Sequence, residues 1–136
     1  MIKIQEGCPT AEAWLTLRRA VGFAPYPLEA AERGLQHTLK CFCALDQEDR
    51  MVGLVKLQGD GVTSFLVHDL IVLPAWQGKG VGGMLLERAL EYIRASRTPG
   101  ASVCLLSAAG KEPFYEKYGF RRRPGNGKGC GMALDE

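Results

Sequence analysis

The stretch that decides the fold is Asp69-Leu-Ile-Val-Leu-Pro-Ala-Trp-Gln-Gly-Lys-Gly-Val-Gly-Gly-Met84. An apolar strand runs into Pro74, four glycines follow within the six residues 78–83, and an amphipathic helix begins among them. Such a turn directs several free backbone N–H groups at one spot, and the helix dipole adds partial positive charge there. The stretch therefore predicts a phosphate-binding turn at the start of a helix.

Two motifs carry a resemblance to a known family. Gln77-x-x-Gly80-x-Gly82 matches the loop that binds the acyl-CoA pyrophosphate in the GNAT superfamily of N-acetyltransferases, and residues 113–120, Pro-Phe-Tyr-Glu-Lys-Tyr-Gly-Phe, resemble its FYxxxGF segment. The resemblance is continuous from about Val52 to Leu134, because both motifs keep their spacing. It implies one acetyltransferase domain that uses acetyl-CoA to acetylate a primary amine of a small molecule.

The glycines also fit other patterns. Gly78-x-Gly80-x-x-Gly83 satisfies the dinucleotide-binding GxGxxG, which expects an acidic residue about 20 positions later. The segment at that distance, residues 101–106, contains no Asp or Glu. No Gly-Lys-Ser/Thr sequence of a P-loop occurs either. A glycine turn that only lets a helix pack closely is the remaining alternative.

Hydrophobic periodicity predicts an α/β (α+β) chain in a single domain, residues 1–136. The expected strands are residues 1–5, 40–45, 51–57, 63–73 and 101–106, with a last hairpin of 120–123 and 130–134. The expected helices are residues 10–21, 28–39, 81–95 and 111–118. In the first helix, Ala13, Leu17, Ala20 and Val21 are expected on the buried stripe. With the resemblance, this order implies a GNAT fold: a mixed, mostly antiparallel central sheet, splayed at the acyl-CoA site and flanked by about four helices.

Composition narrows the possible partners. The chain is 46% hydrophobic and 24% charged, and its net charge of +2 gives no electrostatic support for nucleic-acid binding. Arg121–Arg123 is its basic cluster, either an exposed loop or a neighbour of a nucleotide phosphate. No apolar segment has the length of a membrane span, and the N-terminus lacks a signal-peptide core, so we expect no membrane association and a cytoplasmic location.

Cysteine spacing indicates no metal centre. The five cysteines, at positions 8, 41, 43, 104 and 130, lack a repeated CxxC pattern. Cys41 and Cys43 would share one face of a strand, but no His or Cys pair nearby completes a zinc set. We expect reduced structural thiols and no bound metal.

The resemblance also assigns the acetyl-CoA site. Unpaired backbone groups of Leu70, Ile71 and Val72 would bond the pantetheine arm as an added strand does. The pyrophosphate would lie on the glycine turn, with the Gln77 side chain as a further donor and Lys79 solvated beside it. The turn residues expected in this role are Gln77, Gly78, Lys79, Gly80, Val81, Gly82 and Gly83.

Acetyl transfer needs a proton donor for the thiolate and a neutral amine. The resemblance places Tyr115 beside the sulfur as general acid, since a phenol stays protonated at neutral pH. His68 is a candidate base, because arylalkylamine N-acetyltransferases carry a histidine two residues before the position of Leu70. Asp69 competes as base, although it points to the other face unless a bulge rotates the strand. A chain of waters to bulk solvent would serve as well.

An aromatic loop is the candidate for contact with the acceptor amine. Phe23 and Tyr26 lie in the loop that covers the amine site in this fold, and they are either walls for an aryl or alkyl amine or plugs of the core. Glu29 and Glu32 would attract a cationic amine or simply face water. Acetylation of a protein N-terminus or lysine, a non-catalytic acyl-CoA-binding regulator and a nucleotide oxidoreductase are the other functions considered. The resemblance is also compatible with a homodimer.

Overall fold

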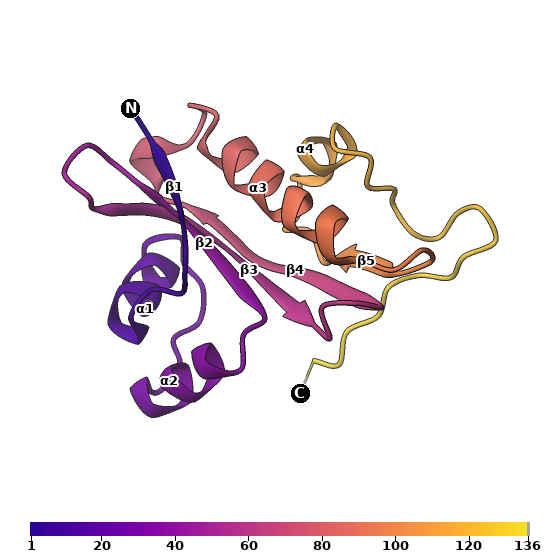
Figure 1. Cartoon of the computed structure of the whole chain (residues 1–136), viewed down its shortest axis with the longest axis horizontal. Helices are drawn as coiled ribbons and strands as arrows, with labels where there is room; N and C mark the ends of the chain where they lie inside the picture. Colours follow the sequence, from indigo (N-terminus) through magenta and orange to yellow (C-terminus); the bar gives the residue numbers. More distant parts are fainter. Residues whose placement is uncertain (136) are drawn as a thin grey trace. The chain divides into compact units, whose positions relative to one another are not determined.

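The computed structural model describes residues 1–135 of the 136-residue chain. The chain divides into two compact units, with the boundary between Val103 and Cys104. The strands are β1 (Lys3–Glu6), β2 (Lys40–Leu45), β3 (Met51–Gly59), β4 (Ser64–Val72) and β5 (Ser102–Leu105). The helices are α1 (Ala11–Ala20), α2 (Leu28–Gln36), α3 (Val81–Ser96) and α4 (Glu112–Glu116), with a 3-10 turn at Pro74–Trp76. Figure 1 shows them in the colours of the sequence.

The strands follow one another in the sheet in chain order, β1-β2-β3-β4-β5. The pairs β1–β2, β2–β3 and β3–β4 are antiparallel. The connection from β4 to β5 runs through α3, the crossover that joins parallel neighbours. The predicted mixed, mostly antiparallel sheet with four helices is therefore confirmed. The predicted splay of the sheet at the acyl-CoA site stays a prediction.

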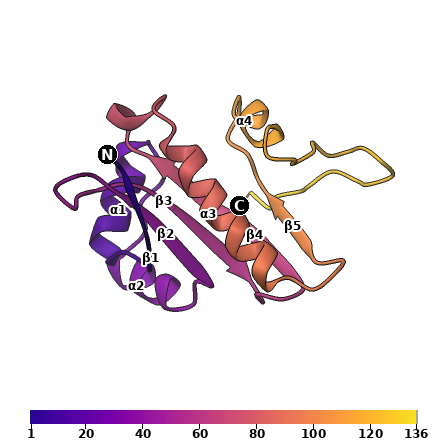
Figure 2. The same ribbon diagram turned by 45° about the horizontal axis from the view of Figure 1, so that its top comes forward.

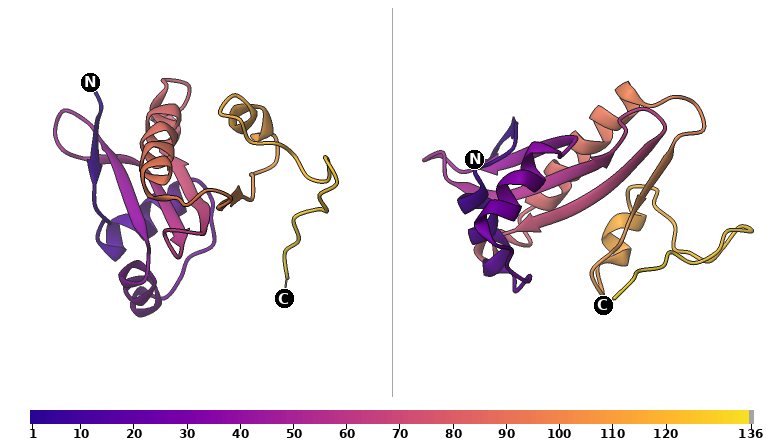
Figure 3. Two further views of the ribbon diagram at one scale, coloured as in Figure 1. Left: turned by 45° about the vertical axis from the view of Figure 1, so that its right-hand side comes forward. Right: turned by 90° about the horizontal axis from the view of Figure 1, so that it is seen from below.

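In the first unit, helices cover both faces of the sheet. The α1 and α2 helices lie on one face and α3 lies on the other, as the views in Figures 1 and 2 and the left view of Figure 3 agree. Side chains alternate along a strand, so each strand supplies both layers. Cys41, Cys43 and Leu54 pack with α1, whereas Phe42, next in sequence, contacts Tyr92 of α3 with its ring. The expectation that Cys41 and Cys43 share a face is thus confirmed.

Local sequence signals placed most of the elements of this unit. Thr10 caps α1, because its hydroxyl accepts a hydrogen bond from the Ala13 N–H. The predicted strand at residues 40–45 is observed with those bounds. In α3, the apolar residues Leu86, Ala89, Leu90 and Ile93 are buried on one stripe, as an amphipathic helix requires. None of the described helices is both long and apolar enough to span a bilayer.

The expected stripe of α1 is confirmed only in part, because Leu17 is buried and Ala13 and Val21 are half-buried. The buried residues of this helix are Ala11, Trp14, Leu15, Leu17 and Arg18, and Ala20 is exposed. The charged side chain of Arg18 belongs to the buried face because it forms an ion pair with Asp69 of the sheet. A hydrophobicity pattern does not reveal such a pair.

The second unit departs from the expected last hairpin. Residues 120–123 and 130–134 form no strand, and the segment between them contains an isolated bridge between Gly125 and Lys128. Pro124 lacks an N–H for a strand ladder, and glycines at alternate positions from 125 to 131 raise the entropic cost of ordering. The segment expected as a buried strand at residues 101–106 alternates instead between exposed and half-buried positions.

Gly59 at the end of β3 supports a stability prediction. Its φ is +125°, and a Cβ there would collide with the backbone carbonyl of Ser64. We expect Gly59→Ala to lower the free energy of unfolding by about 2 kcal/mol or more in urea titrations. Gly34→Ala is the matched control, since Gly34 lies in α2 with open space around it and should gain about 0.5–1 kcal/mol. Equal stabilities of the two variants would contradict this account.

Candidate active site

The strand that precedes the glycine turn contains a β-bulge. Leu54 of β3 pairs with Ile71 of β4, but Lys56 pairs with His68, so Asp69 and Leu70 both stand opposite the single residue between Leu54 and Lys56. Asp69 adopts a left-handed backbone with φ of +52°. The rotation of the strand that would turn Asp69 away from its regular face is thus present.

The bulge turns the Asp69 carboxylate into the layer under α1. Its side chain is only 6% exposed. Oδ2 accepts hydrogen bonds from Trp14 Nε1 at 2.9 Å and from Arg18 Nη1 at 3.1 Å, and Arg18 Nη1 also lies 3.1 Å from Oδ1. Both oxygens therefore have donors, and the carboxylate does not face solvent as a base for an acceptor amine would.

Arg18 joins this carboxylate to the aromatic loop. Its Nη2 donates to the Ala24 carbonyl at 3.0 Å, and its guanidinium carbon lies 4.4 Å from the ring centroid of Tyr26 and 5.3 Å from that of Phe23. Trp14 and Tyr26 are in ring contact at 5.7 Å. The two aromatic residues expected to wall the acceptor site are thus together, but the face that they turn to Arg18 already holds a cation. Both remain about 40% exposed, with their other sides toward solvent.

A second buried cation lies in the same layer. Lys56 is only 3% exposed, and its ammonium lies 4.0 Å from the ring centroid of Trp14. Burial lowers the pKa of Lys56, and the nearby Asp69 carboxylate opposes that shift. The layer under α1 therefore contains one carboxylate between two cations.

His68 occupies the exposed side of this cluster. Its side chain is 44% exposed, and Nδ1 lies 3.3 Å from Asp69 Oδ1. The structure therefore brings His68 and Asp69 together, with the imidazole toward solvent and the carboxylate behind it. An imidazole with one nitrogen near a carboxylate and the other free is a competent proton acceptor.

The glycine turn has the backbone expected of an anion site. Gly78 and Gly80 have φ values of +76° and +84°, and a Cβ at either position would meet open space. Gly80 is the N-cap of α3, with no side-chain cap, and the first turn of this helix has no acidic residue. The first N–H groups of a helix lack partners within it, so they remain available to a ligand. Glycine is required at position 80 by the backbone conformation, whereas Gly82 and Gly83 lie inside α3.

Two side chains of this turn have partners of their own. Gln77 Nε2 donates to the Val72 carbonyl at 2.9 Å, which ties the turn back to the end of β4. The Lys79 ammonium lies 5.3 Å from the ring centroid of Trp76 and is exposed. Gln77 therefore braces the turn in this structure and keeps one amide hydrogen for a further acceptor.

In the second unit, Tyr115 belongs to an aromatic group on α4. Its ring lies 5.1 Å from that of Phe114 and 6.0 Å from that of Phe120, and the rings of Phe114 and Tyr118 lie 5.4 Å apart. Burial raises the pKa of the Tyr115 phenol. The hydroxyl therefore stays protonated at neutral pH, as a proton donor must.

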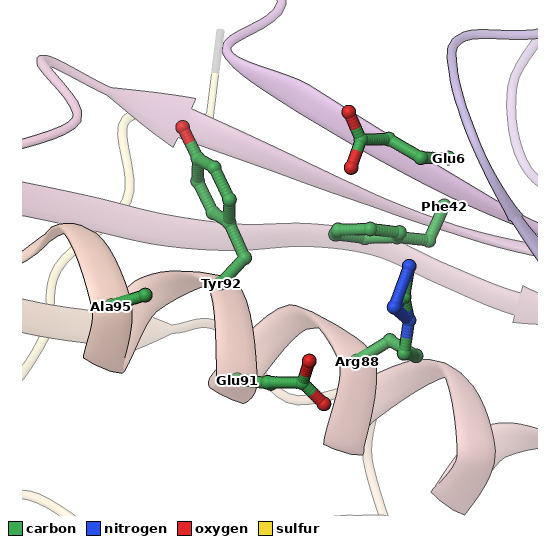
Figure 4. Close-up of a pocket in the computed structure, with 6 residues that line it drawn as sticks. All are labelled: Glu6, Phe42, Arg88, Glu91, Tyr92 and Ala95. Atoms are coloured by element: carbon green, nitrogen blue, oxygen red, sulfur yellow. The ribbon is translucent and has the colours of Figure 1, made fainter.

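A shallow hollow of about 150 Å³ lies on the α3 side of the sheet (Figure 4). Its lining residues are Glu6, Phe42, Arg88, Glu91, Tyr92 and Ala95. The Arg88 guanidinium lies 4.8 Å from the Phe42 ring centroid, and the lining residue Glu6 forms an ion pair with Lys40. None of the expected site residues lines this hollow, and its small volume does not suit an acyl-CoA.

Sequence reasoning missed three residues of the cluster, Trp14, Arg18 and Lys56. A faint signal was present, since Trp14 and Arg18 are one helical turn apart and Lys56 interrupts an apolar strand. No group of three or more His, Cys, Asp or Glu side chains within residues 1–135 is placed to hold a metal ion.

The buried pair of Arg18 and Asp69 generates a prediction. Removal of one partner leaves an uncompensated buried charge, so Arg18→Met should lower the free energy of unfolding by about 3 kcal/mol. The double variant Arg18→Met/Asp69→Asn should lose clearly less than the sum of the two single losses. Urea titrations of the wild type, both single variants and the double variant test this, and losses that add within about 0.5 kcal/mol would show that the pair is not coupled.

Comparison with known proteins agrees with this geometry. A family model described as an acetyltransferase (GNAT) domain matches residues 38–122. A solved structure of a probable acetyltransferase from Staphylococcus aureus is 32% identical with a TM-score of 0.89, and each chain is covered in full. A GNAT-family acetyltransferase from Streptococcus pneumoniae is 33% identical with a TM-score of 0.81, covering 100% of this chain and 98% of that one.

Curated relatives are longer proteins. The GCN5-related N-acetyltransferase 1, chloroplastic, of Arabidopsis thaliana is 30% identical over 81% of this chain and 55% of its own length. The serotonin N-acetyltransferase 2, chloroplastic, of rice is 29% identical over 76% of this chain and 52% of its own length. This chain thus spans about half the length of these two relatives. From the family model and the two bacterial structures together, the chain belongs to the GNAT superfamily of acetyltransferases.

Proposed function

We propose that residues 1–136 act as one acetyl-CoA-dependent N-acetyltransferase domain that acetylates a primary amine of a small molecule. The observation that carries the proposal is the left-handed turn at Gly78 and Gly80, which opens α3 directly after the bulged strand β4. This turn offers free N–H groups and no acidic side chain, which fits the pyrophosphate of acetyl-CoA. Backbone groups of Leu70, Ile71 and Val72 would hold the pantetheine arm.

The proposed reaction is direct attack of the amine on the thioester. The amine nitrogen forms a bond to the acetyl carbon, and the bond from that carbon to sulfur breaks. His68 takes the proton of the acceptor ammonium, because its imidazole faces solvent whereas the Asp69 carboxylate is covered. Tyr115 gives its proton to the departing thiolate, and the raised pKa of its phenol keeps that proton in place until then. The amine nitrogen loses its second proton as the amide forms, and this proton restores the phenol.

The acceptor class rests on the aromatic loop and on one relative. The exposed sides of Phe23 and Tyr26 offer apolar surface to an aryl or alkyl amine, and the loop that carries them is tied down by Arg18. A rice relative has serotonin, an arylalkylamine, in its name. Acetylation of a peptide or protein amine is the alternative, and it would need an open groove in place of an enclosed pocket.

The cellular setting is also a proposal. We propose a cytoplasmic location because the five cysteines are an odd number without a repeated spacing, as expected of reduced thiols in a reducing compartment. The names of two curated relatives specify the chloroplast. Fractionation of cells that express the full-length protein would decide between these compartments.

The direct test is mass-spectrometric detection of acetylated product from acetyl-CoA with arylalkylamines, polyamines, amino acids and peptides. Product detection avoids the background that five thiols would give in a thiol-trapping assay. Acetylation of small amines in preference to peptides is expected. Acetyl-CoA binding without any product would favour a non-catalytic regulator, and exclusive acetylation of peptides would favour the alternative substrate class.

The glycine turn predicts the effect of a charge. Gly80→Asp should weaken acetyl-CoA binding at least about a hundredfold, because a carboxylate would stand where phosphate is expected. Gly100→Asp is the matched control, since Gly100 has nearly the same φ, +83° against +84°, and open space around it. Isothermal titration with acetyl-CoA measures both, and normal affinity of Gly80→Asp would exclude the turn as the phosphate site.

The phenol of Tyr115 predicts a loss of turnover. Tyr115→Phe should lower kcat on the order of 100-fold while the affinity for acetyl-CoA stays within about twofold, because only the proton donor is removed. Tyr118→Phe removes the other hydroxyl of the same short segment and should leave kcat unchanged. Steady-state kinetics on the best amine of the panel makes the comparison, and equal kcat values would remove Tyr115 from the chemistry.

A further inference from the structure

The β-bulge has brought two adjacent side chains to the same face of the sheet. In a regular strand, His68 and Asp69 would point to opposite faces. With φ of +52° at Asp69, the carboxylate turns back under the imidazole, and His68 Nδ1 lies 3.3 Å from Asp69 Oδ1. The extra residue that creates this contact leaves the pairing of Ile71 with Leu54 intact, so it reorients the two side chains without shifting the end of the strand.

We propose that Asp69 is a positioning residue, which holds the His68 imidazole with its proton on Nδ1 and leaves Nε2 free to accept the proton of the acceptor amine. The inference rests on the proposed function for its catalytic consequence, whereas the contact between the two side chains stands on the geometry alone. The proton moves from the acceptor ammonium to Nε2, and Asp69 does not itself take it.

The two carboxylate oxygens have different tasks. Oδ2 accepts from the Trp14 indole at 2.9 Å and from Arg18, which anchors the carboxylate. Oδ1 receives Arg18 as well and faces His68 Nδ1. Because Oδ1 has a second lone pair and the imidazole is the group on its exposed side, an Nδ1–H is the arrangement that satisfies both.

The surrounding charges keep Asp69 an acceptor. Arg18 from α1 lies against the carboxylate, and Lys56 from β3 is the cross-strand partner of His68 in the same layer. Arg18 carries only N–H donors, so both carboxylate oxygens are acceptors in this contact. A solvent-exposed imidazole backed by such a group has one preferred tautomer, as in other carboxylate–histidine pairs.

Asp69→Asn should reverse the tautomer. Trp14 and Arg18 both donate to Oδ2, so the amide oxygen would take that place, and Arg18 Nη1, now shared between both oxygens, would keep this one acceptor. The amide N–H₂ would then take the place of Oδ1, toward His68 Nδ1. Nδ1 must then accept, so the proton moves to Nε2 and the free acceptor is lost. Trp14→Phe is the matched control, because it removes a donor to the same carboxylate without changing the group that faces His68.

The tautomer is read by long-range ¹H–¹⁵N NMR on protein labelled in histidine. The chain has two histidines, His37 and His68, so His37→Gln assigns the signals and His37 serves as internal reference. Above the pH at which imidazole titrates, the wild type and Trp14→Phe should show the Nδ1–H form of His68. Asp69→Asn should show mainly the Nε2–H form. The Nε2–H form in the wild type would overturn the proposal even where Asp69→Asn fails to fold.

Kinetics adds a second, independent readout. Asp69→Asn should lower kcat at least about tenfold with the KM for acetyl-CoA within about twofold. In a His68→Ala background the same substitution should cost nothing further, since Asp69 would act only through the imidazole. An equal loss in both backgrounds would overturn the proposal. If the wild type acetylates no amine, the proposed function fails, and the NMR result still decides whether Asp69 orients His68.

Discussion

The ion pair between Arg18 and Asp69 is the constraint on which the rest of this site depends. Both side chains are more than nine-tenths buried, where an unpaired charge is costly, so each requires the other. Their contact fixes α1 against β4 and holds Asp69 in its left-handed backbone. Through the Ala24 carbonyl, the same guanidinium also fixes the loop after α1. One side chain thus sets the positions of a helix, a bulge and a loop.

The bulge and the glycine turn lie at opposite ends of the same short stretch of chain and do different work. At Asp69 the left-handed backbone reorients side chains, so that a carboxylate and an imidazole share a face. At Gly78 and Gly80 the left-handed backbone reorients N–H groups, and glycine is favoured there because φ is +76° and +84°. Gln77 links the two by its hydrogen bond to the Val72 carbonyl. In the proposed function, this stretch would place the acyl donor on the glycine turn near the base His68.

Aromatic residues in this protein have more than one use. From the sequence, Phe23 and Tyr26 were either walls of an acceptor site or plugs of the core, and in the structure both rings lie against the Arg18 guanidinium. A cation on that face stiffens the loop, which is what a preformed acceptor site requires. The aromatic group around Tyr115 serves differently, since it withdraws the phenol from water and so keeps its proton.

Most of the fold and part of the site were predictable from the sequence. Periodicity and capping placed β2, α1 and α3, because those signals are local, and the glycine pattern located the turn before α3. The last hairpin was not predictable, since a strand needs a partner that a local pattern does not supply. The burial of Asp69 beside Arg18 could not be predicted either, because the sequence of the strand shows only an acidic residue after a histidine.

By itself, the sequence determined the family, the glycine turn and the candidates for base and acid, because each depends on residues close together in the chain. Only the tertiary structure decided which candidate faces solvent and which is buried. Asp69 is 51 residues from Arg18 and 55 from Trp14. A contact over such a separation leaves no periodic trace in either segment, so the burial of these charges and the bulge that they stabilise emerge only when α1 packs on β4.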